Sequence, residues 1–149
     1  MSQLLHSTEI DALLARLDGS GSDSEWHAVK LLQAHANLPE LLLNWYGQSR
    51  KLGARASCVY HSLRYAKDNQ SAFNLGVIAT GDKSKVVRYR AAMLLAIAQN
   101  PAAIPSLETL GENEQSRSDA QAAINAIRLR NPNLFVDRDG TGRVTLNVN

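Results

Sequence analysis

The sequence predicts an all-α protein, a short α-solenoid of helix pairs that is closed at its C-terminal end by a small β-hairpin. Apolar residues recur at helical spacing through most of the chain. Proline and glycine stand where these helices are expected to begin and end. Similar helix pairs also return at regular intervals, since Ala91 recurs as Ala122 and Arg55 recurs as Arg90. The number of residues from Ala91 to Ala122, or from Arg55 to Arg90, is typical of the spacing between one helix pair and the next in helical-repeat architectures.

Length and composition limit the class of protein. The 149 residues suit a single domain, and 44% apolar with 20% charged residues is the composition of a globular chain. A formal net charge of +2 is too small to require a nucleic-acid partner. The single cysteine, Cys58, cannot form an internal disulfide. We therefore expect a protein of the reducing cytoplasm, monomeric or weakly dimeric.

Two kinds of membrane signal are not expected from the sequence. The N-terminal stretch MSQLLHSTEIDALLARL lacks a basic region before its apolar run, and acidic residues interrupt that run, so it does not predict a signal peptide. No window approaches the uninterrupted apolar length of a membrane span.

The expected elements follow in order along the chain. Residues 1–20 predict an N-terminal capping helix that starts near Thr8 and leads into the flexible stretch DGSGSDS. Residues 23–130 predict the helix pairs, and residues 82–113 hold the clearest pair. Its first helix has one apolar face, ends at Asn100-Pro101, and is followed by a second helix that Gly111 caps. The residues of that apolar face are Val87, Ala91, Leu94, Leu95 and Ala98.

This clearest pair resembles the short HEAT-like repeat, the armadillo-like type also found in phycobilisome lyases. The resemblance lies in Asp82, the Val87-Arg88 pair, the Ala91-Ala92 pair and the segment AIPSLETL of residues 103–110. The stretches RKLG of residues 50–53 and SRSD of residues 116–119 depart from the pattern, which leaves the repeat count open. The resemblance implies an α-solenoid whose second helices line a concave binding surface, and it does not imply catalysis.

The C-terminal residues 134–149 change to a two-residue periodicity. Val144, Leu146 and Val148 alternate with polar residues after a glycine-containing turn, which predicts a β-hairpin covering the last repeat. Asp137 and Asp139 also begin a pattern like a calcium-binding EF-hand loop. The twelfth position of that loop would be Val148 instead of a glutamate, so we expect a turn stabilised by aspartate and no metal site.

Other candidate chemistry is sparse, and we expect neither a cofactor nor an enzyme. Cys58 and His61 are one turn apart on one helix and could form a thiolate–imidazole pair. A small buried cysteine beside a surface histidine is the favoured interpretation, because no third, orienting residue can be identified. His27 and His35 have no acidic or cysteine ligand at zinc spacing. The sequence contains no phosphate-binding, dinucleotide-binding or nucleophile-elbow motif.

The expected function is protein binding through the concave face, as in an adaptor or a bacterial immunity protein. The second helices would offer accessible positions at Asn44, Trp45, Tyr46, Asn74 and Glu108, although Trp45 would also suit the core. The alternative is a nucleic-acid-binding protein, because basic residues interleaved with tyrosines concentrate in the two central repeats. That basic set includes Arg55, Arg64, Lys85 and Arg90, whereas Arg88 is expected to pair with the carboxylate of Asp82.

Overall fold

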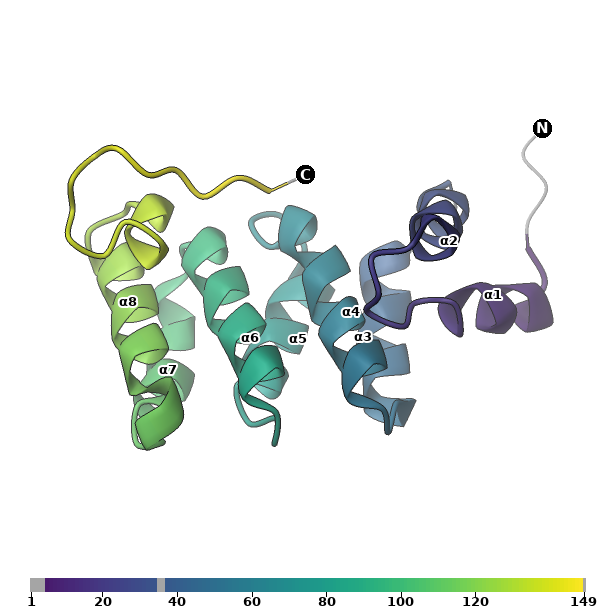
Figure 1. Cartoon of the computed structure of the whole chain (residues 1–149), viewed down its shortest axis with the longest axis horizontal. Helices are drawn as coiled ribbons and strands as arrows, with labels where there is room; N and C mark the ends of the chain where they lie inside the picture. Colours follow the sequence, from purple (N-terminus) through teal and green to yellow (C-terminus); the bar gives the residue numbers. More distant parts are fainter. Residues whose placement is uncertain (1–4, 35–36, 149) are drawn as a thin grey trace.

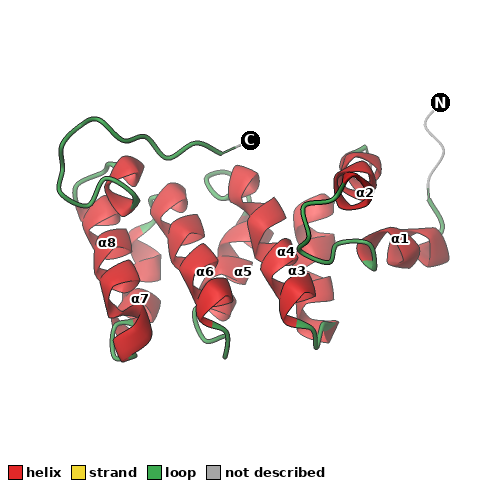
Figure 2. Ribbon diagram, viewed as in Figure 1, coloured by secondary structure: helices red, strands yellow, loops and turns green. Residues whose placement is uncertain are grey.

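The computed structural model describes residues 5–34 and 37–148, and this part of the chain is all-α, as the sequence predicts. Within these described residues there are eight α-helices and no β-strand (Figure 2). The α-helices are α1 (Ser7–Leu14), α2 (Asp23–Gln33), α3 (Leu38–Gln48), α4 (Leu52–Ser62), α5 (Gln70–Ala79), α6 (Lys85–Ala98), α7 (Ile104–Leu110) and α8 (Arg117–Arg128). Four short 3-10 helices accompany them: η1 (Leu63–Tyr65), η2 (Pro101–Ala103), η3 (Glu114–Ser116) and η4 (Pro132–Phe135).

The helices form two layers (Figure 1). α4, α6 and α8 stand side by side in the near layer, and α3, α5 and α7 lie behind them. α6 has the central place, since it packs against α4, α5 and α8. α1 and α2 lie at the N-terminal end and run in different directions from the upright central helices. The chain therefore runs from one end of the row to the other, so that each helix contacts mainly its near neighbours.

Local signals in the sequence explain several helix boundaries. The side chains of Ser22, Asn69 and Ser84 accept hydrogen bonds from the first free backbone amides of α2, α5 and α6. Gln99 takes a left-handed conformation, with φ of 56°, and ends α6 just before Asn100-Pro101. Gly111 follows α7 as expected, but with φ of −65° it has a right-handed conformation, so its place does not depend on glycine's freedom.

The core runs through the whole row of helices, and α6 is buried on more than one side. Leu94 and Leu95 of α6 are fully buried, and both lie against Gly76 of α5. A Cβ atom at residue 76 would lie 2.6 Å from Cδ2 of Leu94, so the absence of a side chain there lets α5 and α6 approach closely. Val86, which also belongs to the apolar pattern of α6, is instead 50% exposed.

The loop between α1 and α2 crosses the start of α4 backbone to backbone. Gly19 has φ of 81°, and a Cβ there would lie 2.6 Å from the carbonyl oxygen of Gly53. A Cβ on Gly53 would in turn clash with the carbonyl oxygen of Asp18. The stretch that the sequence suggests is flexible is therefore a fixed crossing, in which Ser20 donates to the Asp18 carboxylate.

The predicted β-hairpin over residues 134–149 is wrong for the described residues. Leu134 and Phe135 belong to η4 instead of a first strand, and Phe135 is fully buried with its ring 5.4 Å from that of Tyr89. Because burial of Phe135 ties this segment to α6 and α8, residues 143–148 have no strand to pair with. They form an extended tail that returns across the ends of α8 and α6 (Figure 1).

Leu94→Ala tests the assignment of the core. We expect a loss of about 2–5 kcal/mol in the free energy of unfolding, because the substitution removes buried surface and leaves a cavity. Leu129→Ala is the matched control, since Leu129 is 69% exposed and the same truncation there should cost less than about half a kcal/mol. Urea denaturation of both variants measures the difference, and equal stabilities would contradict the assignment.

Candidate interaction surface

Asp82 is the centre of a buried polar network that joins three segments. Its Oδ2 atom accepts a hydrogen bond from Arg55 Nε of α4 at 2.8 Å and one from the Tyr46 hydroxyl of α3 at 2.6 Å. Its Oδ1 atom accepts from Arg55 Nη2 at 3.3 Å and from the Ser84 amide at 2.8 Å. Burial alone would raise the pKa of Asp82, but these donors outweigh it and hold the pKa below its usual value. Asp82 thus fixes α3, α4 and the start of α6 to one another.

The predicted pairing of Arg88 with the Asp82 carboxylate is wrong, because Arg55 occupies that carboxylate. Arg88 binds the backbone carbonyl of Asp82 at 2.9 Å and the Ser116 hydroxyl at 2.9 Å. Arg55 and Arg88 hold matching places, since each lies near the start of its helix. Arg55 of α4 reaches the loop before α6, and Arg88 of α6 reaches the segment before α8. An arginine at the same place in each helix therefore reaches the segment before the next first helix, where Arg55 binds a carboxylate and Arg88 binds a hydroxyl.

A second buried network holds α2 against α4. Glu25 Oε2 accepts hydrogen bonds from Ser57 Oγ and His61 Nε2, each at 2.7 Å, while Oε1 accepts from the Gly21 amide. Burial lowers the pKa of His61, and the Glu25 contact opposes that shift in part. Ser57 binds Glu25 and not the histidine, so this group is not a nucleophile–base relay. Its three side chains are buried and form a structural contact.

The possible Cys58–His61 pair is not formed. Cys58 is a free, fully buried thiol, and burial, followed by the nearby charge of Glu25, raises its pKa to about 12. His61 is buried with Glu25 as its partner, so the expectation of a surface histidine is also wrong. The sequence does mark Glu25 as part of a helix start, because Ser22 and Glu25 match a capping box. That motif does not predict that Glu25 is buried.

The five second-helix positions do not form one surface. Asn44, Asn74 and Glu108 are exposed on α3, α5 and α7. Trp45 is half-buried beside the loop between α1 and α2, where it lines a groove with Leu17 and Gly53. Tyr46 is half-buried and donates its hydroxyl hydrogen to Asp82. The three exposed positions stay a prediction for a binding surface on this layer.

The four basic positions also separate. Arg55 is 8% exposed and committed to Asp82. Arg64 and Lys85 are exposed, but they lie near opposite ends of the α4–α6 pair, since Arg64 follows the end of α4 and Lys85 begins α6. Arg90 is half-buried and donates from Nη1 to the carbonyl oxygen of Ala56 at 3.1 Å.

An aromatic–arginine patch, defined as Trp26, Tyr60 and Arg90, lies across α2, α4 and α6. The Tyr60 and Trp26 rings form a T-shaped pair at a centroid distance of 6.1 Å, and the Arg90 guanidinium lies 5.1 Å from the Tyr60 ring centre. Tyr60 is 38% exposed and Trp26 is half-buried. Sequence reasoning missed this patch, because only the packing of α2 and α6 against α4 brings the three residues together.

Exposed apolar residues extend the patch along the same helices. Leu52 of α4 and Val86 of α6 are 48% and 50% exposed, and Tyr89 is 36% exposed. Leu52 and Tyr60 are separated by two turns of α4, and Val86 and Arg90 by one turn of α6, so each pair shares a helix face. We call this surface the α4–α6 face.

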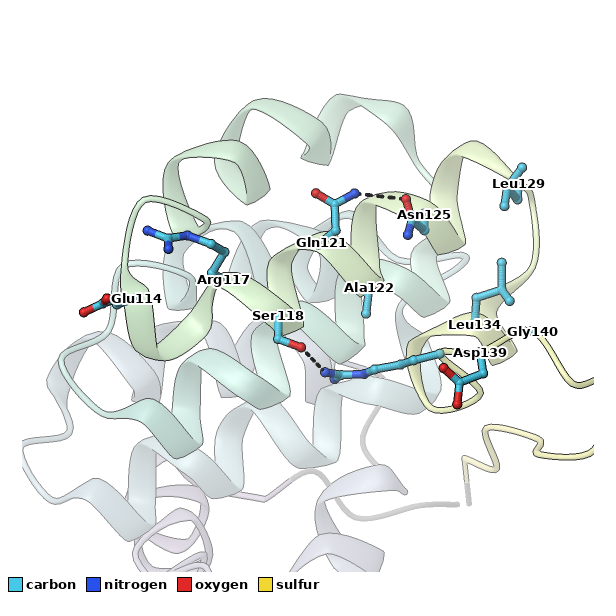
Figure 3. Close-up of a pocket in the computed structure, with 11 residues that line it drawn as sticks. Glu114, Arg117, Ser118, Gln121, Ala122, Asn125, Leu129, Leu134, Asp139 and Gly140 are labelled. Atoms are coloured by element: carbon cyan, nitrogen blue, oxygen red, sulfur yellow. Dashed lines mark hydrogen bonds between the residues drawn. The ribbon is translucent and has the colours of Figure 1, made fainter.

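A groove of about 760 Å³ lies at the outer side of α8 (Figure 3). Gln121 donates to Asn125 along the helix at 3.0 Å, and Arg138 binds Ser118 and Asp119 at 2.9 Å each. Leu129 projects from the rim. The groove lacks the exposed tyrosine and half-buried tryptophan of the α4–α6 face, and its Arg138 is already paired with Asp119. It therefore presents fewer of the side chains that anchor protein interfaces.

The Asp137 segment is a turn, as the sequence predicts. The Asp137 carboxylate accepts hydrogen bonds from the Thr141 amide and hydroxyl and from the Gly142 amide, and Gly140 and Gly142 have positive φ. These hydrogen bonds, led by the Thr141 hydroxyl, lower the pKa of Asp137. Among the described residues no group of three or more His, Cys, Asp or Glu side chains could hold a metal ion.

Comparisons with known proteins give no match to a family model, a curated protein or a solved structure. Across residues 5–34 and 37–148, no helix combines the length and apolar character needed to cross a membrane.

Asp82→Asn tests the central network. Removing the charge leaves the buried Arg55 guanidinium without its partner, so we expect a loss of about 3–5 kcal/mol in the free energy of unfolding. Because the folded pKa of Asp82 lies below its unfolded value, its stabilising effect is present above about pH 4 and is lost as pH falls through the folded pKa. Urea denaturation at pH 7 and over the acid range should show a lower stability for the variant and a weaker acid dependence.

Asp68→Asn is the control for this test, because Asp68 is exposed. Its effect at pH 7 should stay within about half a kcal/mol. A variant at residue 82 that is as stable as wild type would contradict the central role of the network.

Cys58 provides a test of burial that does not require mutation. At pH 8 a thiol reagent such as DTNB should react with folded protein about a thousandfold more slowly than with a free thiol, because little thiolate is present. Unfolding in guanidinium should restore a rapid reaction. Fast labelling under native conditions would show that the α2–α4 contact opens readily.

Proposed function

We propose that this chain is a non-enzymatic protein-binding module that docks its partner on the α4–α6 face. The observation that carries the proposal is the aromatic–arginine patch, in which Tyr60 is exposed between Trp26 and Arg90. Tryptophan, tyrosine and arginine are the side chains that most often dominate the energy of protein interfaces. The expected concave face of the second helices is thus replaced, as the proposed docking site, by a face of the first helices.

The patch is held in place before any partner binds. Trp26 also meets the ring of His61 at 4.9 Å, and His61 is fixed by Glu25. Arg90 is fixed by the Ala56 carbonyl through one of its N–H donors, so further donors can bind a carboxylate. Side chains ordered in advance lose less conformational entropy on association, which favours binding.

The surrounding charge favours an acidic partner. The central part of the chain exposes basic residues near both ends of the α4–α6 pair. They are Arg50, Lys51, Arg64, Lys67, Lys83 and Lys85. Charges of one sign around an apolar centre speed association with a partner of opposite sign and exclude partners of the same sign.

We also propose that the helix pairs are HEAT-like repeats of a short α-solenoid. The contact of Arg55 with the loop before α6 recurs one helix pair later, when Arg88 contacts the segment before α8. A contact that recurs at the repeat period supports this interpretation. The cytoplasmic location and the monomeric or weakly dimeric state stay predictions.

Nucleic-acid binding is the second candidate, and one observation favours it. Lys51 and Lys85 lie at the N-terminal ends of α4 and α6, which emerge at the same edge of the molecule (Figure 1). Lys83 adds a third exposed cation to that edge. A line of exposed cations can follow a phosphate backbone.

A paired-variant capture experiment tests these proposals. Wild-type chain, Tyr60→Ala/Arg90→Ala and Asn44→Ala/Asn74→Ala would each be immobilised and exposed to lysate of the source cell, with and without nuclease treatment. We expect the first variant to lose a specifically captured protein and the second to retain it. In a direct titration with that protein, losing the patch should weaken affinity by about thirtyfold, the effect of an interface hot spot.

Circular dichroism melting would show that both variants are folded. Loss of capture by the Asn44/Asn74 variant alone would place docking on the second helices and overturn the proposed face. Capture that requires nucleic acid, and disappears after nuclease treatment, would favour the second candidate.

A further inference from the structure

The C-terminal tail lies in a groove that it does not fill. Leu63, which begins η1, and Ile97, near the end of α6, give this groove an apolar floor, and Leu146 and Val148 of the tail lie against it. A space of about 430 Å³ remains there. We call this site the tail groove. It can hold an extended chain with apolar side chains at alternate positions, and it has room for a larger occupant.

The tail is held weakly compared with the rest of the fold. In residues 143–148 the backbone contact with the helical body is the Leu146 amide, which donates to Asn133 Oδ1 at 2.9 Å. Leu146 and Val148 are half-buried, and Val144 is 45% exposed. Segments with few buried contacts and few hydrogen bonds open at low free-energy cost. The tail can therefore leave the groove without unfolding the helices.

The tail has no acidic side chain to pair with the basic residues on the rim of the groove. Arg64 and Lys67, both exposed, lie on the rim of the groove beside Asp68. Residues 143–148 contribute Arg143 and no acidic side chain. An extended segment with carboxylates in place of the polar tail residues would add attraction to the same apolar contacts.

The tail groove is continuous with the α4–α6 face. Tyr60 and Arg64 are one turn apart along one side of α4 and η1, and Ile97 lies two turns after Arg90 on α6. A partner docked on the aromatic–arginine patch could therefore extend a chain segment into the groove.

We propose that the tail groove is a docking site for an acidic, extended segment of a partner protein, with apolar residues at alternate positions, and that the tail occupies this site until the partner displaces it. This proposal rests on the proposed protein-binding function and names the chemistry of the partner. A displaceable tail lowers the apparent affinity of the groove by the fraction of molecules in which the groove is open.

The probe is a fluorescent hexapeptide, Glu-Val-Glu-Leu-Glu-Val, which keeps the apolar pattern of residues 143–148 and supplies three carboxylates. Fluorescence anisotropy would measure its affinity for the full chain, with Lys-Val-Lys-Leu-Lys-Val as the charge control. We expect the acidic peptide to bind and the basic peptide to bind at least tenfold more weakly. Leu146→Ser/Val148→Ser, which releases the tail, should strengthen binding of the acidic peptide by about tenfold if the tail fills about nine-tenths of the grooves.

Charge reversal locates the binding site. Arg64→Glu/Lys67→Glu should weaken binding of the acidic peptide by about tenfold or more, because it reverses the rim. Arg50→Glu/Lys51→Glu makes the same change of net charge at exposed positions of the loop between α3 and α4, and should have a much smaller effect. A fluorophore on Asn147→Cys should report the departure of the tail as the acidic peptide binds, since native Cys58 is buried.

Three results would overturn the proposal. They are an unchanged affinity after tail release, an equal loss from both charge reversals, and a tail that stays in place while the peptide binds. A concentration-dependent dimer that disappears in the tail-release variant would instead assign the groove to the tail of a second copy.

The peptide experiment and the capture experiment test the tail groove and the α4–α6 face separately. If the peptide fails to bind but Tyr60→Ala/Arg90→Ala still abolishes capture, the docking face stands and the tail groove is not part of it. If the peptide displaces the tail while the patch variant captures protein normally, the groove stands and the proposed face is wrong.

Discussion

The carboxylate of Asp82 is the constraint on which the central packing of this molecule depends. A buried carboxylate is costly to remove from water unless donors surround it, and the donors here come from α3, α4 and the start of α6. Shifting any one of these segments by a single residue would leave a buried charge without its partners. Hydrogen bonds require particular distances and directions, so this network restricts the placement of these segments more narrowly than apolar contacts do. Asp82 therefore sets the relative positions of helices that hydrophobic burial alone would only hold together.

The helices and their core could be predicted from the sequence because both depend on local rules. The apolar spacing in residues 87–98 and the Asn100-Pro101 stop place α6 correctly, and Leu94 is buried as its position in the pattern requires. The hairpin fails because alternation in residues 144–148 is only half of a strand pair. The segment around Phe135, which would have formed the first strand, instead packs against Tyr89. This tertiary contact cannot be inferred from a local sequence pattern.

The partners of polar groups could not be predicted, since they join residues far apart in the sequence. Arg55 and Arg88 are both suitable partners for Asp82 by charge, and only the packing of α4 against α6 decides between them. The partner of buried His61 is Glu25, which belongs to a different helix pair. The residues of the candidate surface are likewise far apart in the sequence. The expected second-helix positions come from a general property of helical repeats, whereas Trp26, Tyr60 and Arg90 meet only once α2 and α6 are packed against α4.

The crossing of Gly19 and Gly53 restricts the sequences that can adopt this fold. Neither position can accept a side chain, because a Cβ on either one would clash with backbone atoms of the other segment, and backbone cannot rotate away. Chains with this fold should therefore still carry both glycines after their overall similarity is lost. Between the two glycines, one helix pair apart, they should carry a glutamate that reaches the helix containing the second glycine. This combination offers a compact signature for finding distant relatives by pattern instead of by overall resemblance.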